Sequence, residues 1–177
     1  MFIRVHSWPE KVFVAGTILQ VNISRGGLPK RPIEGGFIGT LGVEGDFHDH
    51  PQFHGGPRKA ILIIASEVVD ELQRRGYPVY YGALGENLTT RGLDIRDLRI
   101  GDRVRAGGVM LEITAPRIPC RQLDVYGPSI QQEIYDPKVK ALDASSHHWG
   151  MSGFYASVLA PGPVGAGDPI EVLAKMA

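Results

Sequence analysis

The chain has 177 residues, enough for a single domain spanning residues 1–177 with a complete hydrophobic core. Apolar residues make up 43% of the sequence and charged residues 21%, which excludes an intrinsically disordered chain. Lys plus Arg and Asp plus Glu number 19 each, so no overall basic charge points to nucleic acid as a partner. The sequence contains no secretion signal and no long apolar run, so we expect a cytoplasmic protein with no membrane partner.

The first part of the chain predicts strands separated by a long loop. Residues 2–5 and 11–24 are rich in apolar and β-branched side chains and predict two strands, the second with a bulge at Gly16. Residues 35–58 are rich in Gly, Pro, His and Asp without periodicity, so we expect a long loop of the kind that often carries function. Residues 59–65 (KAILIIA) form a continuous apolar run, which predicts a strand buried on both faces.

Residues 66–75 (SEVVDELQRR) predict the clearest helix of the chain. Ser66 is placed to cap its first turn, two arginines lie in its last turn, and Gly76 ends it. Its buried face is predicted to consist of Val68, Val69 and Leu72.

The second half predicts more short strands, at residues 87–90, 103–106, 109–114, 153–159 and 170–175. Gly107 and Gly108 are typical of a two-residue hairpin turn between two of them. Residues 128–142 predict one or two short helices interrupted at Pro137. We therefore expect a mostly β fold, a closed or partly open barrel of about seven or eight strands with a few short peripheral helices.

The only cysteine, Cys120, is the first candidate for a functional residue. It follows Pro119 and lies between Arg117 and Arg121. Nearby positive charge favours the thiolate, which is the form that attacks electrophiles or binds metals. One cysteine cannot form an internal disulfide or a cysteine zinc cage. The alternative is a buried structural cysteine, because free cysteine is among the most buried residue types.

Polar clusters supply further candidates. One cluster contains Asp46, His48, Asp49, His50 and His54. These residues either bind a divalent metal or are ordinary solvated loop residues. The run His54-Gly55-Gly56, followed by Arg58 and Lys59, suits either an anion-binding turn or a plain turn.

Glu86 and Asn87 offer an acceptor and an amide for a heteroaromatic ring edge, or simply make a turn. The motifs GxGxxG, P-loop, GxSxG and HExxH are absent, so a nucleotide-dependent dehydrogenase and a serine hydrolase have no support.

Four segments in order resemble the MOSC domain, named for the C-terminal domain of molybdenum cofactor sulfurase. They are GVEGDFHDHPQFHGGPRKAI (42–61), GENLTTRGLDIRDLRIGDRVRAGGVMLEIT (85–114), PRIPCRQL (116–123) and SGFYASVLAPGPVGAGDPIEV (152–172). The sequence is similar to the stand-alone bacterial branch, which includes proteins that give resistance to N-hydroxylated purines.

The resemblance implies a barrel-like fold and a molybdenum cofactor (molybdopterin), with Cys120 as the catalytic residue and metal ligand. At family level it also implies pyridoxal phosphate binding. The residues it suggests for cofactor contact are His54, Gly55, Gly56, Arg58, Lys59, Glu86, Asn87, Arg117 and Arg121. Two positions depart from the family pattern: Arg58 replaces an acidic residue, and Gln122 replaces a common lysine.

Three functions follow as hypotheses. The first is an oxidoreductase that reduces N-hydroxylated small molecules such as nucleobases, with electrons from a separate protein, since the sequence lacks a cysteine cluster for iron and sulfur. The second is a sulfur carrier in which Cys120 takes a persulfide from a cysteine desulfurase. The third is a non-catalytic binding domain with Cys120 in the core. We expect a monomer or a homodimer.

Overall fold

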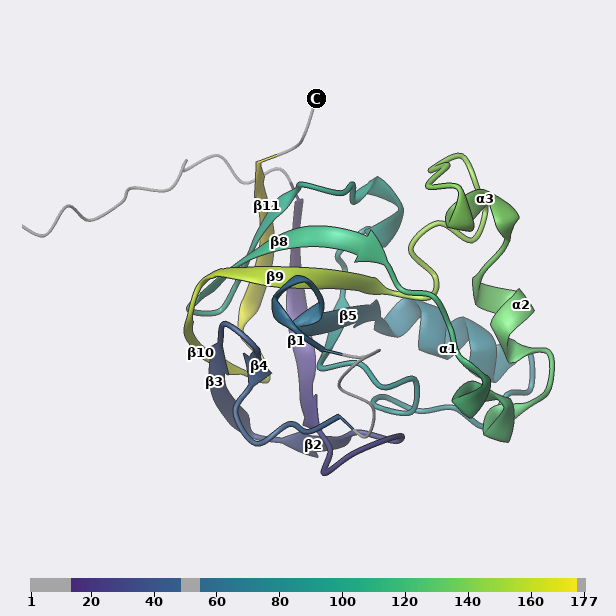
Figure 1. Cartoon of the computed structure of the whole chain (residues 1–177), viewed down its shortest axis with the longest axis horizontal. Coiled ribbons are helices and arrows are strands. Elements are labelled where there is room, and N and C mark those ends of the chain that lie inside the picture. Colours follow the sequence, from purple (N-terminus) through teal and green to yellow (C-terminus); the bar gives the residue numbers. More distant parts are fainter. Residues whose placement is uncertain (1–13, 49–54, 175–177) are drawn as a thin grey trace, which may run out of the picture.

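The computed structural model describes residues 14–48 and 55–174 (Figure 1). Its strands are β1 (Val14–Ile23), β2 (Arg31–Ile33), β3 (Gly35–Gly39), β4 (Gly42–Val43), β5 (Ile61–Ala65), β6 (Leu88–Arg91), β7 (Arg103–Ala106), β8 (Val109–Pro116), β9 (Phe154–Ala160), β10 (Gly162–Gly165) and β11 (Pro169–Ala174). Its helices are α1 (Ser66–Arg74), α2 (Ile130–Ile134) and α3 (Pro137–Lys140), with short 3₁₀ helices η1 (Pro57–Lys59), η2 (Ile95–Asp97) and η3 (Arg121–Tyr126).

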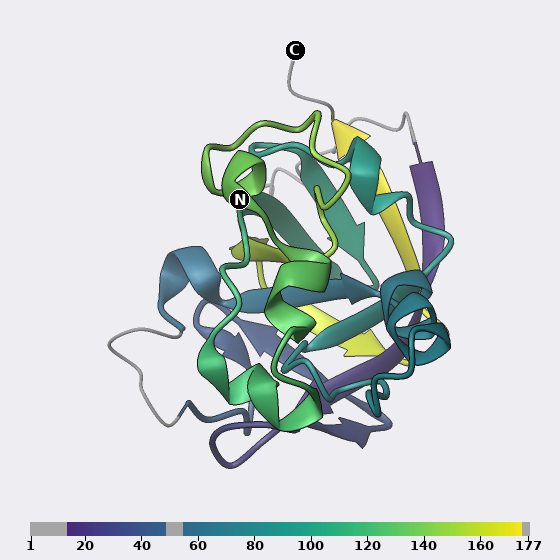
Figure 2. The ribbon, with the colours of Figure 1, turned by 90° about the vertical axis from the view of Figure 1, so that its right-hand side faces the viewer.

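The main sheet closes on itself and confirms the expected β-barrel. Its strand order is β11-β7-β8-β9-β5-β6-β1-β2, and β1 also pairs with β11 through Val14–Thr17. Seven strands therefore form the barrel and β2 is an extra strand on β1. A smaller sheet, β10-β3-β4, lies beside it, and the α-helices lie together at one end of the barrel (Figures 1 and 2).

The core strand predicted from the apolar run is confirmed as β5. All five of its side chains are buried, and it pairs with β9 on one edge and with β6, in parallel, on the other. A strand with neighbours on both edges and no exposed side chain requires an uninterrupted apolar sequence, which residues 61–65 supply.

The predicted helix is confirmed as α1, with one correction at its start. Val68, Val69 and Leu72 are buried, and Gly76 follows the helix with φ +94°. Ser66, however, is the first helical residue rather than the cap: Ala65 precedes it in extended conformation, and no side chain caps the helix. The Ser66 hydroxyl instead accepts a hydrogen bond from Arg91 Nε at 3.2 Å.

Two predictions about the first half were wrong. Residues 35–58 are not one loop, because β3 and β4 form there and β3 pairs with β10. Gly16 is regularly paired with Ile170, and the register shift of β1 falls between Ile18 and Gln20. A Cβ at Gly16 would lie 2.5 Å from Arg91 O, so glycine is needed there for close approach of the backbones.

The second half follows the prediction with one omission. The two-residue turn Gly107–Gly108 joins β7 to β8, as expected. Pro137 begins α3 after the interruption, and the Asp136 side chain caps it. The strand β10 within the predicted closing loop was not foreseen, and the strand predicted at residues 2–5 lies outside the described residues. No helix in the described part of the chain is long and apolar enough to cross a membrane.

Candidate functional site

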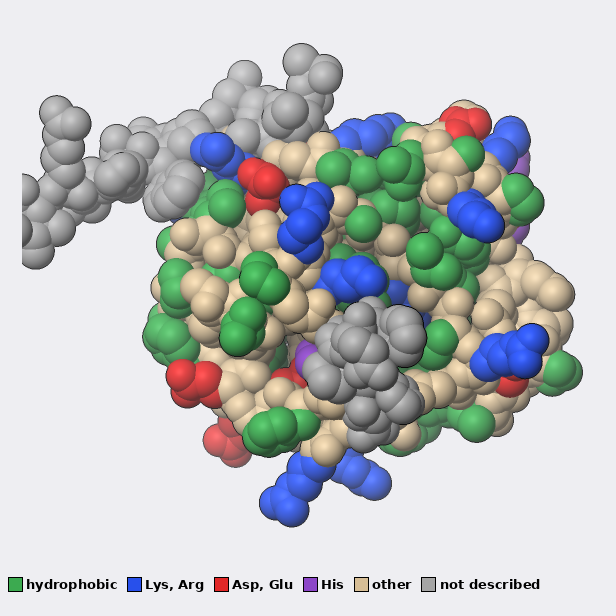
Figure 3. Space-filling view, in the orientation of Figure 1, with side chains coloured by type: hydrophobic (Ala, Val, Ile, Leu, Met, Phe, Trp, Pro, Cys, Tyr) green, Lys and Arg blue, Asp and Glu red, His purple; other side chains and the backbone are tan. Residues whose placement is uncertain are grey.

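Cys120 lies in a pocket built from segments that are far apart in the sequence. Its polar lining comes from Lys30 and His48 in the first part of the chain, Asn87 before β6, Arg117 and Gln122 around the cysteine, and Tyr155 on β9. Strands β5 and β9 face the viewer in Figure 1, and Figure 3 shows Lys and Arg side chains gathered near the centre of this face.

Two hydrogen bonds made by the backbone of Arg117 fix the segment that carries the thiol. After β8 ends, the Arg117 N–H donates to Gly153 O at 2.8 Å, and Arg117 O accepts a hydrogen bond from Ser152 Oγ at 2.6 Å. Cys120 then adopts an extended conformation and precedes η3. Its side chain is half-buried and lies 4.0 Å from Gln122 Oε1. Cys120 therefore opens to the pocket, and the alternative of a cysteine enclosed in the core was wrong.

Arg117 presents an unpaired donor beside the thiol. The residue is 5% exposed, and its Nη2 donates to Leu84 O at 2.9 Å. Its Nη1 is buried and has no hydrogen-bond partner in the described protein. A buried guanidinium nitrogen without an acceptor costs free energy, so the position favours a ligand that brings an oxygen to it.

A buried ion pair braces the floor of the pocket. Lys30 Nζ lies 2.5 Å from Asp46 Oδ1, and the two side chains are 6% and 3% exposed. Asn87 Nδ2 donates to Asp46 Oδ2 at 2.8 Å, while Asn87 Oδ1 accepts the Leu62 N–H at 3.1 Å. Asn87 thus ties β5 to the segment of Asp46, in addition to lining the pocket.

These contacts also bear on the predicted divalent-metal cluster. Asp46 is already engaged by Lys30, by Asn87 and by the Ser24 N–H at 2.8 Å. Asp49, His50 and His54 lie outside the described residues. Within residues 14–48 and 55–174, no three His, Cys, Asp or Glu side chains are grouped so as to hold a metal ion.

Glu86 lies behind the pocket and does not line it. Its Oε1 accepts hydrogen bonds from the Gly82 N–H at 2.6 Å and Thr89 Oγ1 at 3.0 Å, and its Oε2 is buried without a partner. Burial raises the pKa of this carboxyl above its usual range, although its hydrogen bonds and Arg117 act in the opposite direction.

Two titratable side chains in the pocket are held in their neutral forms. Burial lowers the pKa of His48, and the charge of Lys30 lowers it further, while Asp46 opposes both. Burial raises the pKa of Tyr155, Arg117 lowers it, and Cys120 raises it. The Lys59 ammonium lies 5.5 Å from the centre of the Tyr155 ring. A neutral imidazole and a neutral phenol therefore face the pocket at pH 7.

The remaining predicted residues lie around this pocket at different distances. Gly55 is close to it, because a Cβ there would meet the His48 ring at 2.8 Å, and Lys59 reaches it through Tyr155. Gly56 and Arg58 are exposed, and Arg58 contributes its carbonyl to Thr114 Oγ1. Arg121 is exposed and does not line the pocket. His54 lies outside the described residues.

Sequence reasoning missed Lys30 and Tyr155. Lys30 lies in the connection between β1 and β2, where a lysine is ordinarily solvated. Tyr155 lies in the alternating strand β9, and alternation alone does not distinguish a pocket wall from an ordinary barrel position. Only the pairing of β9 with β5 and β8 places Tyr155 beside Cys120.

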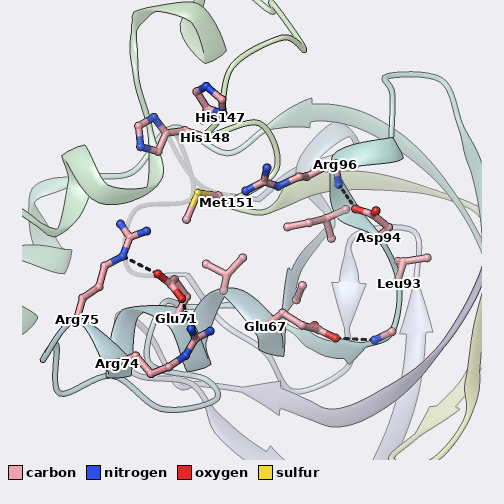
Figure 4. Close-up of a pocket in the computed structure, with 14 residues that line it drawn as sticks. Glu67, Glu71, Arg74, Arg75, Leu93, Asp94, Arg96, His147, His148 and Met151 are labelled. Atoms are coloured by element: carbon pink, nitrogen blue, oxygen red, sulfur yellow. Dashed lines mark hydrogen bonds and ion pairs between the residues drawn. The ribbon is translucent and has the colours of Figure 1, made fainter.

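A larger cavity of about 550 Å³ lies elsewhere, between α1, residues 92–96 and residues 147–151 (Figure 4). Its carboxylates are already engaged: Glu71 pairs with Arg74 and Arg75, and Glu67 accepts the Gly92 N–H at 2.8 Å. Cys120 lies in the other pocket, which therefore remains the candidate site.

Comparison of the chain with known protein families identifies its class. The MOSC domain family model matches residues 50–171, and the chain belongs to this family.

Individual relatives refine this assignment. The chain is 30% identical to Protein YiiM of Escherichia coli over 144 residues (77% of this chain, 58% of that protein) and 31% identical to the uncharacterized protein YflK of Bacillus subtilis over 154 residues (84% and 64%). A protein of Gibberella moniliformis named "Reductase" is 28% identical over 144 residues (78% and 24%). The crystal structure of YiiM from Geobacillus stearothermophilus matches with a TM-score of 0.66 at 27% identity, covering 90% of this chain and 75% of that one. The chain thus spans about three-fifths of the length of YiiM and YflK.

Proposed function

We propose that this MOSC domain protein binds the molybdenum cofactor in the Cys120 pocket and reduces N-hydroxylated compounds, with electrons from a separate protein. The observation that carries the proposal is the half-buried thiol of Cys120 beside Arg117, whose buried Nη1 lacks an acceptor. The relative named "Reductase" supports the reaction class.

The Cys120 pocket encloses only about 70 Å³, so its residues fit one end of such a group rather than the whole cofactor. A thiolate is a soft ligand of the kind that transition metals in sulfur-rich cofactors accept. The free Nη1 of Arg117 suits a phosphate or pterin oxygen. Gly85 has φ +88°, and a Cβ there would lie 2.5 Å from the Leu28 side chain, so the pocket wall leaves no room for a larger residue.

The protein's own groups have distinct tasks in this proposal. Cys120 holds the metal, and Arg117 orients the anionic part of the cofactor. His48 stays neutral and adds no second positive charge beside Lys30. When bound, the cofactor supplies two electrons to the N–O bond, and two protons are needed to give the amine and water. Tyr155 keeps its proton at neutral pH and can donate it from Oη to the departing oxygen, while water supplies the second proton and then reprotonates the phenolate.

Metal content tests the binding part of the proposal. The wild type and Cys120→Ser are purified from a host that makes the cofactor, and molybdenum is measured by mass spectrometry. We expect about one metal per wild-type chain and little in Cys120→Ser. Arg96→Gln, on the cavity of Figure 4, is the control and should retain metal. A wild type that binds no molybdenum under reducing, cofactor-replete conditions contradicts the proposal.

The accessible thiol also supports a second candidate, a sulfur carrier. In that case the Cys120 thiolate receives one sulfur atom from a cysteine desulfurase, forming a persulfide that a partner then consumes. Intact-mass measurement after incubation with the desulfurase and cysteine should show one added sulfur atom. If no adduct forms, or if Cys120→Ala gains the same mass, this candidate is wrong.

A further inference from the structure

A cavity of about 820 Å³ adjoins the Cys120 pocket and shares two wall residues with it, Leu28 and Phe47. It is lined by the end of β1, the turn that follows, and β2. The Phe47 N–H donates to Ser24 O at 2.9 Å, which holds the two sides of the cavity together. The two spaces therefore meet at Leu28 and Phe47.

The walls of the adjoining cavity are apolar and carry an exposed aromatic ring. Ile23, Pro29, Pro32 and Ile33 contribute to the lining. Phe47 is 62% exposed, although it lies at the boundary between two cavities. An aromatic side chain in this position offers a face on which a flat ring can stack.

Two unpaired cations complete the cavity. Arg25 and Arg31 both line it and are exposed, and neither forms a hydrogen bond or ion pair with another described side chain. Asp46, the carboxylate nearest in sequence to Phe47, cannot neutralise them, because it is committed to Lys30, Asn87 and Ser24. Arginine recognises phosphate and carboxylate oxygens through its planar set of donors.

We propose that this cavity binds the body of the substrate, and that the substrate is a flat N-hydroxylated compound ending in an oxyanion, as a nucleotide does. The ring stacks on Phe47, the oxyanion lies between Arg25 and Arg31, and the N–O group points past Leu28 to Cys120. The reactive end of this assignment rests on the proposed function. The binding of a flat anion in the cavity does not.

Binding is tested first on the protein without cofactor, so that no turnover is required. Isothermal titration compares adenosine, adenosine 5′-monophosphate and adenosine 5′-carboxylate. We expect each anion to bind at least about tenfold more tightly than adenosine, since charge-assisted contacts to two arginines add more than 1.4 kcal/mol. A preference for phosphate over carboxylate would identify the oxyanion. Equal binding of adenosine and both anions would overturn the proposal.

Substitutions assign the effect to this cavity. Arg25→Gln/Arg31→Gln should abolish the preference for the anions and leave the affinity for adenosine unchanged, whereas Phe47→Ala should weaken all three ligands. Arg96→Gln removes an exposed arginine from the cavity of Figure 4 and should change nothing. A preference that survives in the double variant overturns the proposal.

Turnover separates this inference from the proposed function. In cofactor-loaded protein, the double arginine variant should raise KM about tenfold for the 5′-monophosphate of N-hydroxycytidine and leave kcat unchanged, with no effect on N-hydroxycytosine. If the loaded protein reduces neither compound while arginine-dependent binding persists, the reaction is wrong and the binding site stands. If both compounds are reduced with equal KM in both proteins, the substrate class is wrong and the reaction stands.

Discussion

At the scale of single residues, the pocket depends on a buried ion pair. Lys30→Met leaves the Asp46 carboxylate buried with only an amide and a backbone N–H for compensation. Because an uncompensated buried charge is strongly unfavourable, we expect the free energy of unfolding to fall by about 3 kcal/mol, measured by urea denaturation. Arg74→Met is the matched control: Arg74 is 71% exposed in its pair with Glu71, so the loss should stay below about 1 kcal/mol. Equal losses would show that burial is not the decisive factor.

His48 makes stability depend on pH. Its pKa in the folded protein is lowered from 6.5, so below that pH the unfolded chain binds a proton more readily than the folded one. The free energy of unfolding should therefore fall as the pH drops from 6.5 toward the lower pKa of the folded state. His48→Gln should flatten this dependence in urea titrations between about pH 8 and about pH 5. An unchanged slope would mean that His48 does not titrate in this range.

Part of the site could be predicted from individual residues. Cys120 and its neighbour Arg117 stood out because a single thiol among arginines is chemically distinctive, and Asn87 stood out as an amide suited to a ring edge. The brace of Lys30 on Asp46 could not be predicted, because their closeness depends on how a turn folds back on the barrel. The burial of Glu86 could not be predicted either, since the sequence does not report which way the side chains of the segment before β6 point.

At the scale of elements, the turn at Gly82 joins two parts of the site. Gly82 O accepts the Lys30 N–H at 2.9 Å, and the Gly82 N–H donates to Glu86. Gly82 has φ +95°, and a Cβ there would lie 2.3 Å from Lys30 O. Gly76 has a similar φ of +94°, but a Cβ there would have no atom within 4 Å. A comparison of the two positions therefore separates the cost of the backbone conformation from the cost of a steric clash.

This pair of glycines gives a direct prediction. Gly76→Ala should lower the free energy of unfolding by about 1 kcal/mol, because alanine is disfavoured in a left-handed conformation. Gly82→Ala should cost at least about 2 kcal/mol more, because backbone atoms of Lys30 must also move. Both are measured by urea denaturation, with one-dimensional NMR to show that each variant folds. Similar losses of stability in the two variants would mean that the backbone around Gly82 moves to accommodate a Cβ at little cost.

Elements with local signals were the ones predicted correctly. The β7–β8 hairpin is specified by its two glycines, and β5 and α1 by their apolar patterns. Strands β3 and β10 pair across more than a hundred residues and are mostly glycine and proline in their pairing segments, so neither period nor composition marks them. Their existence follows from how the chain returns to the barrel rather than from local preference.

At the scale of the whole molecule, β1 is the strand that closes the barrel and also carries the extra strand β2. It pairs with β6 and β11 within the barrel, and with β2 only through Val21–Ile23. The strand β2 has three residues, none of them fully buried, whereas β5 is buried throughout. The two strands therefore belong to parts of the molecule with different resistance to local opening.

Hydrogen exchange measures this difference. The amides of β5 should exchange only through global unfolding, so their exchange free energy should fall linearly with urea. The amides of Arg31 and Ile33 should exchange through local opening, with a smaller free energy that responds little to urea, because few buried contacts hold β2. Adenosine 5′-monophosphate, if seated against Arg31, should slow exchange in β2 and leave β7 unchanged. If the amides of β2 and β5 instead have the same exchange free energy, β2 opens only when the whole barrel unfolds. The wall that β2 forms in the adjoining cavity is then rigid before any ligand binds.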